Sequence, residues 1–296
     1  MTKLLVTGAN GFVGRSLCVA LASSGQTVVA ATRHVLSEMG PHISNFQIST
    51  LAADTDWQQG LQGCDAVVHL AARVHVMADT ATDPLTEFRR VNVEGTMNLA
   101  RQAAAAGVRR FVFISSIKVN GESTRLGQIF VADEAPDPQD PYSISKHEAE
   151  QGLSRLAAET GMEVVIIRPP LVYGPGVKAN FQSMMRWLMC GVPLPLGGIH
   201  NKRSLVALDN LVDLIVTCIN HPAAANQIFL AGDGEDLSTT DLLKRMAKAL
   251  GRPSRLIQVP VKVLELGAVL LGKRAVAQRL CGSLQVDISK ARTLLG

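Results

Sequence analysis

A tyrosine and a lysine four residues apart are the first sign of acid–base chemistry in this chain. Tyr142 and Lys146 follow Pro141 at the start of a stretch with helical periodicity. Residues i and i+4 share a helix face, so the ammonium group can lie beside the phenol. A free phenol has a pKa of about 10, and a neighbouring cation favours its ionised form. The pair predicts a general acid or base for a sugar hydroxyl or a carbonyl, and Ser116, just after an upstream β-branched run, can hydrogen-bond the same oxygen.

A glycine-rich turn directly after the first β-branched run is the second chemical signal. Its spacing is G-x-x-G-x-x-G, and it opens a helical stretch. Glycines let a backbone approach a pyrophosphate closely, and the N-terminus of a helix offers free N–H groups to the anion. This context predicts a dinucleotide-binding site. The residues expected to contact the dinucleotide here are Gly8, Asn10, Gly11, Phe12, Val13 and Gly14.

The end of the second β-branched run bears on which dinucleotide is bound. NAD-binding proteins usually place an Asp or Glu there to hold the ribose 2′-hydroxyl, but this chain has Thr32, Arg33 and His34. A guanidinium group can pair with a 2′-phosphate through two hydrogen bonds. Arg33 therefore favours NADP, with NAD left open.

The elements that must position these residues alternate between strands and helices. Both faces of each strand are apolar, as expected for parallel strands covered by helices on two sides. The expected strands are residues 4–7, 27–32, 66–70, 111–115 and 164–168, and the expected helices are 12–24, 84–106 and 141–160. A glycine follows each helix where a left-handed residue would end it. The pattern predicts an α/β fold, a Rossmann-type doubly wound parallel sheet.

Beyond Pro169 and Pro170 the pattern changes to shorter helical pieces interrupted by Gly and Pro. We expect a dinucleotide-binding domain over residues 1–170 and a smaller substrate-binding lobe over 171–296, with some segments of the latter returning to the sheet. Helices are expected in the lobe near residues 181–190, 209–220, 238–250 and 261–271.

Composition excludes several other classes of protein. The chain has 29 Lys and Arg against 25 Asp and Glu, and its basic residues are too dispersed for a nucleic-acid surface. Five widely spaced cysteines without a C-x-x-C pair fit a reducing cytoplasm, and no cluster has metal-ligand spacing. The apolar stretch 263–271 is far shorter than the roughly 20 residues that span a bilayer. We therefore expect a cytoplasmic protein without a metal, nucleic-acid or membrane partner.

Together these motifs resemble extended short-chain dehydrogenases/reductases of the nucleotide-sugar type. The matching segments are residues 7–14 (TGANGFVG), 69–72 (HLAA), 91–96 (VNVEGT), 115–116 (SS), 141–146 (PYSISK) and 168–176 (RPPLVYGPG). The resemblance covers nearly the whole chain. It implies a UDP-sugar substrate and a homodimer formed through helices 84–106 and 141–160.

The resemblance also implies roles for individual residues. Ser116, Tyr142 and Lys146 match the catalytic triad of the family. Further cofactor contacts are implied for Leu70, Ala71, Ala72, Asn92, Ser115 and Pro169, besides Tyr142 and Lys146 themselves. Substrate contacts are implied for Ser116, Asn120, Asn180, Arg203 and Arg279. The chain departs from the family at Asn120, where many members have Tyr, and at Thr50, where an acidic residue often binds the adenine.

These features leave three functions open. The leading interpretation is a reductase of UDP-4-keto-6-deoxy sugars, favoured by Arg33 and the variant sequence around Asn120. The alternative is a 4-epimerase of UDP-glucose or UDP-N-acetylglucosamine, which would use the same triad. A non-catalytic NADP sensor on the same fold is the third, although a sensor has no use for an intact Ser116, Tyr142 and Lys146.

Overall fold

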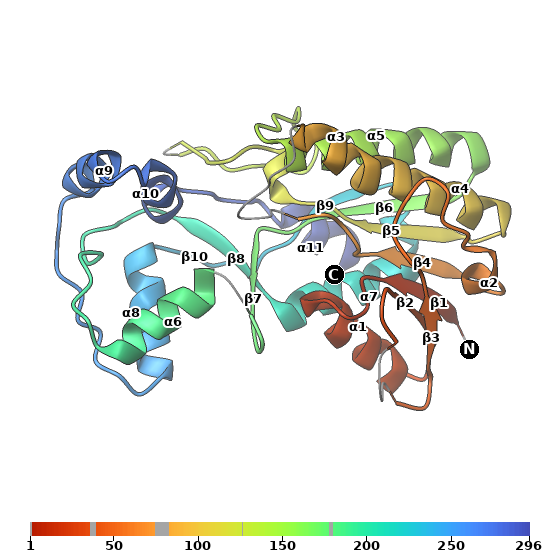
Figure 1. Cartoon of the computed structure of the whole chain (residues 1–296), viewed down its shortest axis with the longest axis horizontal. Coiled ribbons are helices and arrows are strands. Elements are labelled where there is room, and N and C mark those ends of the chain that lie inside the picture. The colour runs from red at the N-terminus through yellow and green to blue at the C-terminus, as the bar shows by residue number, and fades with distance from the viewer. Residues whose placement is uncertain (1, 36–39, 75–82, 126, 178–179) are drawn as a thin grey trace.

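A parallel sheet forms the centre of the larger body of the molecule (Figure 1). The computed structural model describes residues 2–35, 40–74, 83–125, 127–177 and 180–296. Within these residues seven parallel strands pair in the order β3-β2-β1-β4-β5-β6-β9. Their bounds are Lys3–Thr7 (β1), Thr27–Thr32 (β2), Ile43–Gln47 (β3), Ala66–His69 (β4), Arg110–Ile114 (β5), Glu163–Arg168 (β6) and Ile228–Leu230 (β9). The predicted doubly wound fold is confirmed, with the strand order reversing between β1 and β4.

Helices cover both faces of this sheet. Helices α1 (Phe12–Ser23) and α7 (Leu208–Asn220) pack on one face, where fully buried side chains such as Leu17 and Leu211 meet the strands. Helices α2 (Gln58–Leu61), α4 (Thr96–Ala105) and α5 (Pro141–Thr160) pack on the other. Burying one such leucine contributes roughly 2 kcal/mol, so these two apolar layers provide most of the driving force for the fold.

The helix expected over residues 84–106 is interrupted. The structure has α3 (Pro84–Arg89), a π-helical turn η1 (Arg90–Gly95) and then α4. A π turn holds one more residue than an α turn, and such turns are frequent at functional sites. Here the turn carries Asn92, which is buried beneath the carboxyl ends of the strands.

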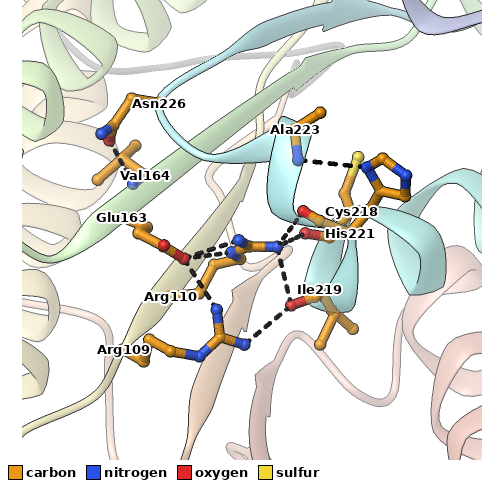
Figure 2. A network of polar contacts seen from close by, with 9 residues as sticks. All are labelled: Arg109, Arg110, Glu163, Val164, Cys218, Ile219, His221, Ala223 and Asn226. Atoms are coloured by element: carbon orange, nitrogen blue, oxygen red, sulfur yellow. Dashed lines mark hydrogen bonds and ion pairs between the residues drawn. The ribbon is translucent and has the colours of Figure 1, made fainter. Parts of the chain in front are cut away.

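Helix α7 is tied to the sheet by one buried arginine (Figure 2). Arg110 is 1% exposed, and its guanidinium donates to the carbonyls of Cys218 (2.8 Å), Ile219 (3.1 Å) and His221 (2.8 Å). The last carbonyls of a helix have no partner within it and form the negative end of its dipole, so a cation is well placed there. Glu163 pairs with the same guanidinium at 2.7 Å. The chain then leads through η3 (Pro222–Ala224) into β9, beside β6.

The remaining elements form the second lobe, at the left of Figure 1, and the C-terminus. Their bounds are Leu171–Tyr173 (β7), Asn180–Cys190 (α6), Arg203–Ala207 (β8), Asp236–Leu237 (β10), Thr239–Ala249 (α8), Val261–Leu270 (α9), Arg274–Cys281 (α10) and Ser289–Leu295 (α11). The short turn η2 (Ile117–Val119) belongs to the large body, between β5 and α5 in the chain. Strand β8 pairs with β7 and β10. Phe181, Met184, Leu205 and Leu243 form the centre of an apolar cluster that joins α6, α8 and β8. The lobe therefore has a small core of its own.

Candidate functional site

The glycine turn lies where the strand order of the sheet reverses. Gly8 follows β1 with a φ of +67°, and its carbonyl accepts the N–H of Gly11 at 2.8 Å. A Cβ added at Gly8 would lie 2.9 Å from the backbone nitrogen of Ala71, and one added at Gly14 would collide with the carbonyl of Gly8. Gly11 begins α1 without a side-chain cap. The turn therefore exposes backbone N–H groups in a cradle shaped for an anion, which fits the pyrophosphate of a dinucleotide.

A buried network joins β1 to the loop after β4. Thr7 Oγ1 accepts the N–H groups of Leu70 (3.2 Å) and Ala71 (3.1 Å). Both of its lone pairs are then used, so its hydrogen is donated to Nδ1 of His69, 2.7 Å away. His69 consequently carries its own proton on Nε2, which lies 2.9 Å from Thr96 Oγ1. These bonds fix the backbone of the loop that faces the glycine turn, and Ala72 follows in the same loop.

His69 stays neutral in this position. Its side chain is fully buried, and its ring lies 5.9 Å from the centroids of both Phe111 and Phe113. Burial lowers its pKa to about 3, and the Lys146 cation acts in the same direction. From the sequence, His69 stood only within the family-like segment 69–72 (HLAA). The structure adds a positioning role, which its place directly before Leu70 could have indicated.

Ser116, Tyr142 and Lys146 come together at the carboxyl end of β5. Asp140 caps α5 by accepting the N–H of Ser143 at 2.7 Å, and this fixes the first turn that carries Tyr142. Burial raises the pKa of the Tyr142 phenol to about 12, with a smaller contribution from the negative charge of Asp140, while a hydrogen bond from Ser116 lowers it. The phenol and the serine hydroxyl are therefore within hydrogen-bond distance of each other, so that one substrate oxygen can contact both.

Lys146 is only 2% exposed, and Nζ donates to the carbonyl of Ile114 at 2.8 Å. The ammonium group also lies 4.3 Å from the centroid of the Phe113 ring. Burial lowers its pKa to about 7, against a raising effect from Glu150. In the protein alone burial opposes charge on both groups, so the expected effect of Lys146 and a bound nicotinamide on the pKa of Tyr142 stays a prediction.

Asn92 braces the first turn of α5. Its Nδ2 donates to Ser145 Oγ (3.0 Å) and to the carbonyl of Arg73 (3.0 Å), and its Oδ1 accepts the N–H of Arg73 at 2.8 Å. Ser145 in turn donates to the carbonyl of Tyr142 at 2.7 Å. The side chain of Asn92 is thus used by protein groups. Its contribution to a cofactor site is to hold Tyr142 and the loop after β4 in place.

A buried ion pair fixes the next layer. Arg168 and Glu150 are 2% and 3% exposed and form two hydrogen bonds, at 2.6 and 3.0 Å. Ser115 donates to the same carboxylate, and Asn120 Oδ1 accepts from Arg168 at 3.0 Å. This pair was not predicted from the sequence. Glu150 lies four residues after Lys146, so the spacing that revealed the Tyr–Lys pair could also have revealed it.

The structure corrects the substrate contact expected for Asn120. Besides accepting from Arg168, its Nδ2 donates to the carbonyl of Val131 and to Glu134, both at 3.0 Å. The side chain is 3% exposed and both of its N–H bonds are used within the protein. Asn120 is therefore a structural residue. The Ser115 hydroxyl is likewise used by Glu150, and the carbonyl of the buried Pro169 accepts the N–H of Ile117 at 3.0 Å.

The remaining predicted residues lie around this centre. Arg33 is exposed at the end of β2, where Gln47 Nε2 donates to its carbonyl at 3.2 Å. In the second lobe, Arg203 donates to the carbonyls of Arg279 (3.1 Å) and Gly282 (3.0 Å), so the structure brings Arg203 to the segment of Arg279. Burial lowers the pKa of Arg203. The side chain of Asn180 lies outside the described part of the structure.

Asn10 is exposed in the turn, whereas Phe12 and Val13 pack partly against the core beneath α1. Within the described residues, no group of three His, Cys, Asp or Glu side chains is placed to hold a metal ion.

Comparison with known proteins agrees with this geometry. The chain matches the NAD dependent epimerase/dehydratase family over residues 4–232. It is 50% identical to a UDP-glucose 4-epimerase of Vibrio cholerae, and the alignment covers 99% of this chain and 90% of that protein.

Solved structures share the fold of this chain. The UDP-glucuronic acid 4-epimerase of Bacillus cereus in complex with NAD superimposes with a TM-score of 0.79 at 23% identity, covering 99% of this chain and 92% of that one. MoeE5 in complex with UDP-glucuronic acid and NAD superimposes with a TM-score of 0.79 at 25% identity and the same coverage. From the matched family, the extent of the match, and the presence of the glycine turn after β1 and of Tyr142 and Lys146 at the carboxyl end of β5, the chain is an enzyme of the NAD dependent epimerase/dehydratase family.

Proposed function

We propose that this enzyme is a 4-epimerase of UDP-hexoses that uses tightly held NAD. The supporting observation is the meeting of the Ser116 and Tyr142 hydroxyls above Lys146, beside the glycine turn. The 50% identity to the Vibrio cholerae UDP-glucose 4-epimerase favours epimerisation over the reduction that the sequence suggested first.

The residues divide the chemistry between them. Ser116 holds the 4-oxygen of the sugar by a hydrogen bond, and Tyr142 takes the proton from the 4-hydroxyl and later returns it. When bound, the nicotinamide would accept the hydride from C4 and return it to the opposite face of the sugar. Lys146, when charged, favours the phenolate that Tyr142 needs to accept the proton.

The second lobe supplies the other half of the proposal. Arg203 and Arg279 are the cations we assign to the diphosphate of the substrate, a role for which guanidinium groups are well suited. An epimerase must hold the diphosphate while the 4-keto sugar rotates to present its opposite face to the nicotinamide. A contact confined to the diphosphate leaves the sugar free to do so.

One observation favours a second candidate, a UDP-4-keto-sugar 4-reductase that uses NADP. Arg33 is exposed at the end of β2, and no carboxylate stands beside it in the sequence to bind the ribose of NAD. An exchangeable NADPH and a 4-keto substrate would fit that arrangement.

One experiment separates the two reactions. The purified enzyme is assayed for bound nicotinamide, then incubated without added cofactor with UDP-glucose and UDP-galactose, and separately with NADPH and a UDP-4-keto-6-deoxy-N-acetylhexosamine. Epimerisation predicts retained NAD and interconversion of the two sugars without net change in nicotinamide absorbance. Stoichiometric oxidation of NADPH, with no interconversion, would replace the epimerase by the reductase. Inactivity in both assays would contradict both candidates and would favour the third function, a non-catalytic dinucleotide sensor.

Arg33 can be tested separately. If the Arg33 side chain contacts a 2′-phosphate, Arg33→Asp should lower the affinity for NADPH more than the affinity for NADH. Calorimetric titration of both cofactors on both proteins would show this. An unchanged ratio would make Arg33 an ordinary surface residue. The homodimer and the cytoplasmic location stay predictions, to be checked by light scattering and cell fractionation.

A further inference from the structure

Helix α9 in the second lobe presents apolar side chains to solvent. We define the α9 apolar face as Val263, Leu266, Val269, Leu270 and Leu271, whose exposed fractions are 57%, 63%, 53%, 79% and 74%. Leu270 and Leu271 are the most exposed large hydrophobic side chains in the described part of the chain. In Figure 1, α9 and α10 form the end of the lobe that lies farthest from the large sheet.

Two partly buried side chains attach α9 to the core of the lobe. Val261 and Leu264, on the opposite side of α9, pack against the apolar cluster of the lobe. Residues 263, 266 and 270 follow the i, i+3, i+7 spacing of a single helix face. A helix with one apolar face in the core and a second apolar face in water has a surface left to bury.

The charge around this face is strongly one-sided. Residues 252–281 contain six Lys and Arg and one acidic residue, Glu265, whereas the rest of the chain has 23 basic and 24 acidic residues. Lys262, Lys273 and Arg274 are exposed next to the apolar face. In the part of the chain that the structure describes, none of these three forms an ion pair. The excess positive charge of the protein is therefore concentrated around one apolar helix.

We propose that the α9 apolar face and its basic rim dock on the surface of a lipid bilayer that contains anionic lipids. Apolar side chains flanked by cations are what an interfacial helix needs, since the former enter the acyl boundary and the latter meet lipid phosphates. A protein partner would need a matching acidic rim around an apolar groove. The excess of six basic residues over the single Glu265 in this segment, and the place of α9 at the end of the lobe, favour the bilayer.

The contact lies along the surface of the bilayer and does not cross it. Among the described helices, none combines the length and apolar composition needed to span a membrane. Helix α9 has 10 residues and is about 15 Å long at 1.5 Å per residue, enough to lie in the interface. The sequence-based expectation of no membrane partner rested on the lack of a spanning segment, which a peripheral contact does not require.

The proposed surface adjoins the proposed substrate contact. Helix α10 begins at Arg274, beside the apolar face, and carries Arg279, whose carbonyl accepts from Arg203. Arg279 lies five positions after Arg274, which corresponds to about 7.5 Å of helix. Docking would hold this part of the lobe close to the lipid headgroups. The inference rests on the exposed face and its charge, and it is independent of the proposed reaction.

Sedimentation with vesicles tests the proposal. The full-length protein is mixed with phosphatidylcholine vesicles with or without 30% phosphatidylglycerol. We expect cosedimentation with the anionic vesicles, weakened by salt. Two double variants, Leu266→Gln with Leu270→Gln and Lys273→Glu with Arg274→Glu, should each lower the partition coefficient roughly tenfold or more. Matched controls, Val19→Gln on the exposed side of α1 and Lys248→Glu on α8, should bind as the wild type does.

The outcomes distinguish docking on lipid from self-association and from misfolding. Thermal melting confirms that each variant is folded, and activity on the soluble substrate should be unchanged because none of these residues belongs to the proposed site. Equal binding to neutral and anionic vesicles, or variants that bind like the wild type, would overturn the proposal. A change from dimer to monomer in the leucine variant, seen by light scattering, would instead make this face an interface between copies of the chain.

Discussion

At the scale of single residues, the site combines buried groups that titrate far from their usual values. Tyr142 and Lys146 occupy the same turn of α5, and burial opposes charge on both. Formation of the phenolate at Tyr142 therefore depends on a bound polar substrate or on the charge of a bound cofactor. In the protein alone the Tyr142 phenol is therefore protonated, whereas Lys146 is charged in part of the molecules at neutral pH.

Replacing the phenol tests the acid–base role. Tyr142→Phe keeps the ring, which packs edge-on against Phe88 at 6.0 Å between centroids, so the fold should persist. Turnover should fall by roughly 10²-fold or more, because the proton has no carrier. The matched control is Tyr173→Phe, which loses a hydrogen bond to Asp233 in the second lobe and should leave turnover within a few-fold. Rates near the wild-type value for Tyr142→Phe would remove this residue from the mechanism.

The buried amine gives a pH-dependent stability. The pKa of Lys146 is about 7 in the folded chain, against 10.5 in the unfolded chain. Between these values the unfolded chain binds more protons, so burial of the amine costs stability that grows as the pH falls to about 7 and is then constant. Lys146→Met should therefore stabilise the cofactor-free protein more at pH 7 than at pH 9.5, by up to about 1.4 kcal/mol per pH unit.

Urea unfolding of both proteins at the two pH values measures this difference. The exposed Lys248→Met is the control and should show no pH-dependent change. A stability difference between Lys146→Met and the wild type that does not vary with pH would mean that the amine is solvated in the folded protein.

At the scale of elements, an ion pair ties the Ser116 turn to the helix that carries Tyr142. Lys118 follows Ser116 in η2 and pairs with Asp140, the capping residue of α5, at 2.6 Å. It also contacts Glu122 at 2.8 Å. Neither group touches the proposed reacting atoms. The pair is placed to keep the two hydroxyls in register.

Lys118→Met should therefore lower kcat by roughly tenfold with a much smaller change in KM for the substrate, because misplaced groups cost rate even when binding persists. Lys118→Arg should restore most of the rate, and Asp140→Asn combined with Lys118→Met should cost little more than either alone. Loss of thermal stability without any fall in kcat would leave Lys118 a purely structural residue.

The elements that were missed show where sequence patterns end. The central strands were predicted because each is a continuous apolar run. Strand β3 was missed because its sequence, ISNFQ, is half polar and lies at an exposed sheet edge. The π turn was missed because residues 90–95 have the same apolar spacing as an α-helix, and the insertion depends on packing, with Gly95 close against Leu51.

At the scale of the whole molecule, the candidate site was partly predictable. The glycine turn and the Tyr–Lys pair are local patterns with a fixed geometry, so spacing was enough to find them. The role of Asn120 could not be predicted, because it depends on contacts with Arg168 and Val131, which only the fold brings together. The positioning role of His69 was not predicted either, because its link to Thr96 depends on how α4 packs over β4.

Arg110 offers a test of how the large body is held together. Arg110→Met removes the arginine that donates to the carbonyls of Cys218, Ile219 and His221, of which Ile219 keeps only a long bond from Arg109 (3.4 Å), and should destabilise the protein by about 3 kcal/mol. Its neighbour Arg109, whose side chain is 51% exposed and also meets Glu163, is the matched control. Arg109→Met should cost less than about 1 kcal/mol in the same denaturation series. Equal effects of the two substitutions would show that Arg110 does not anchor α7.

The contacts of Arg110 with α7 also limit when the large sheet can be completed during synthesis. The carbonyls that Arg110 binds belong to residues 218–221, and the strand that covers the edge of β6 ends at Leu230. A growing chain that has reached residue 170 has all of its glycine turn and its Tyr–Lys pair, but one face of its sheet lacks α7 and β6 is an open edge. Such an edge invites pairing with other chains. The large sheet is therefore complete only after residues up to Leu230, which include the first part of the second lobe, have been synthesised.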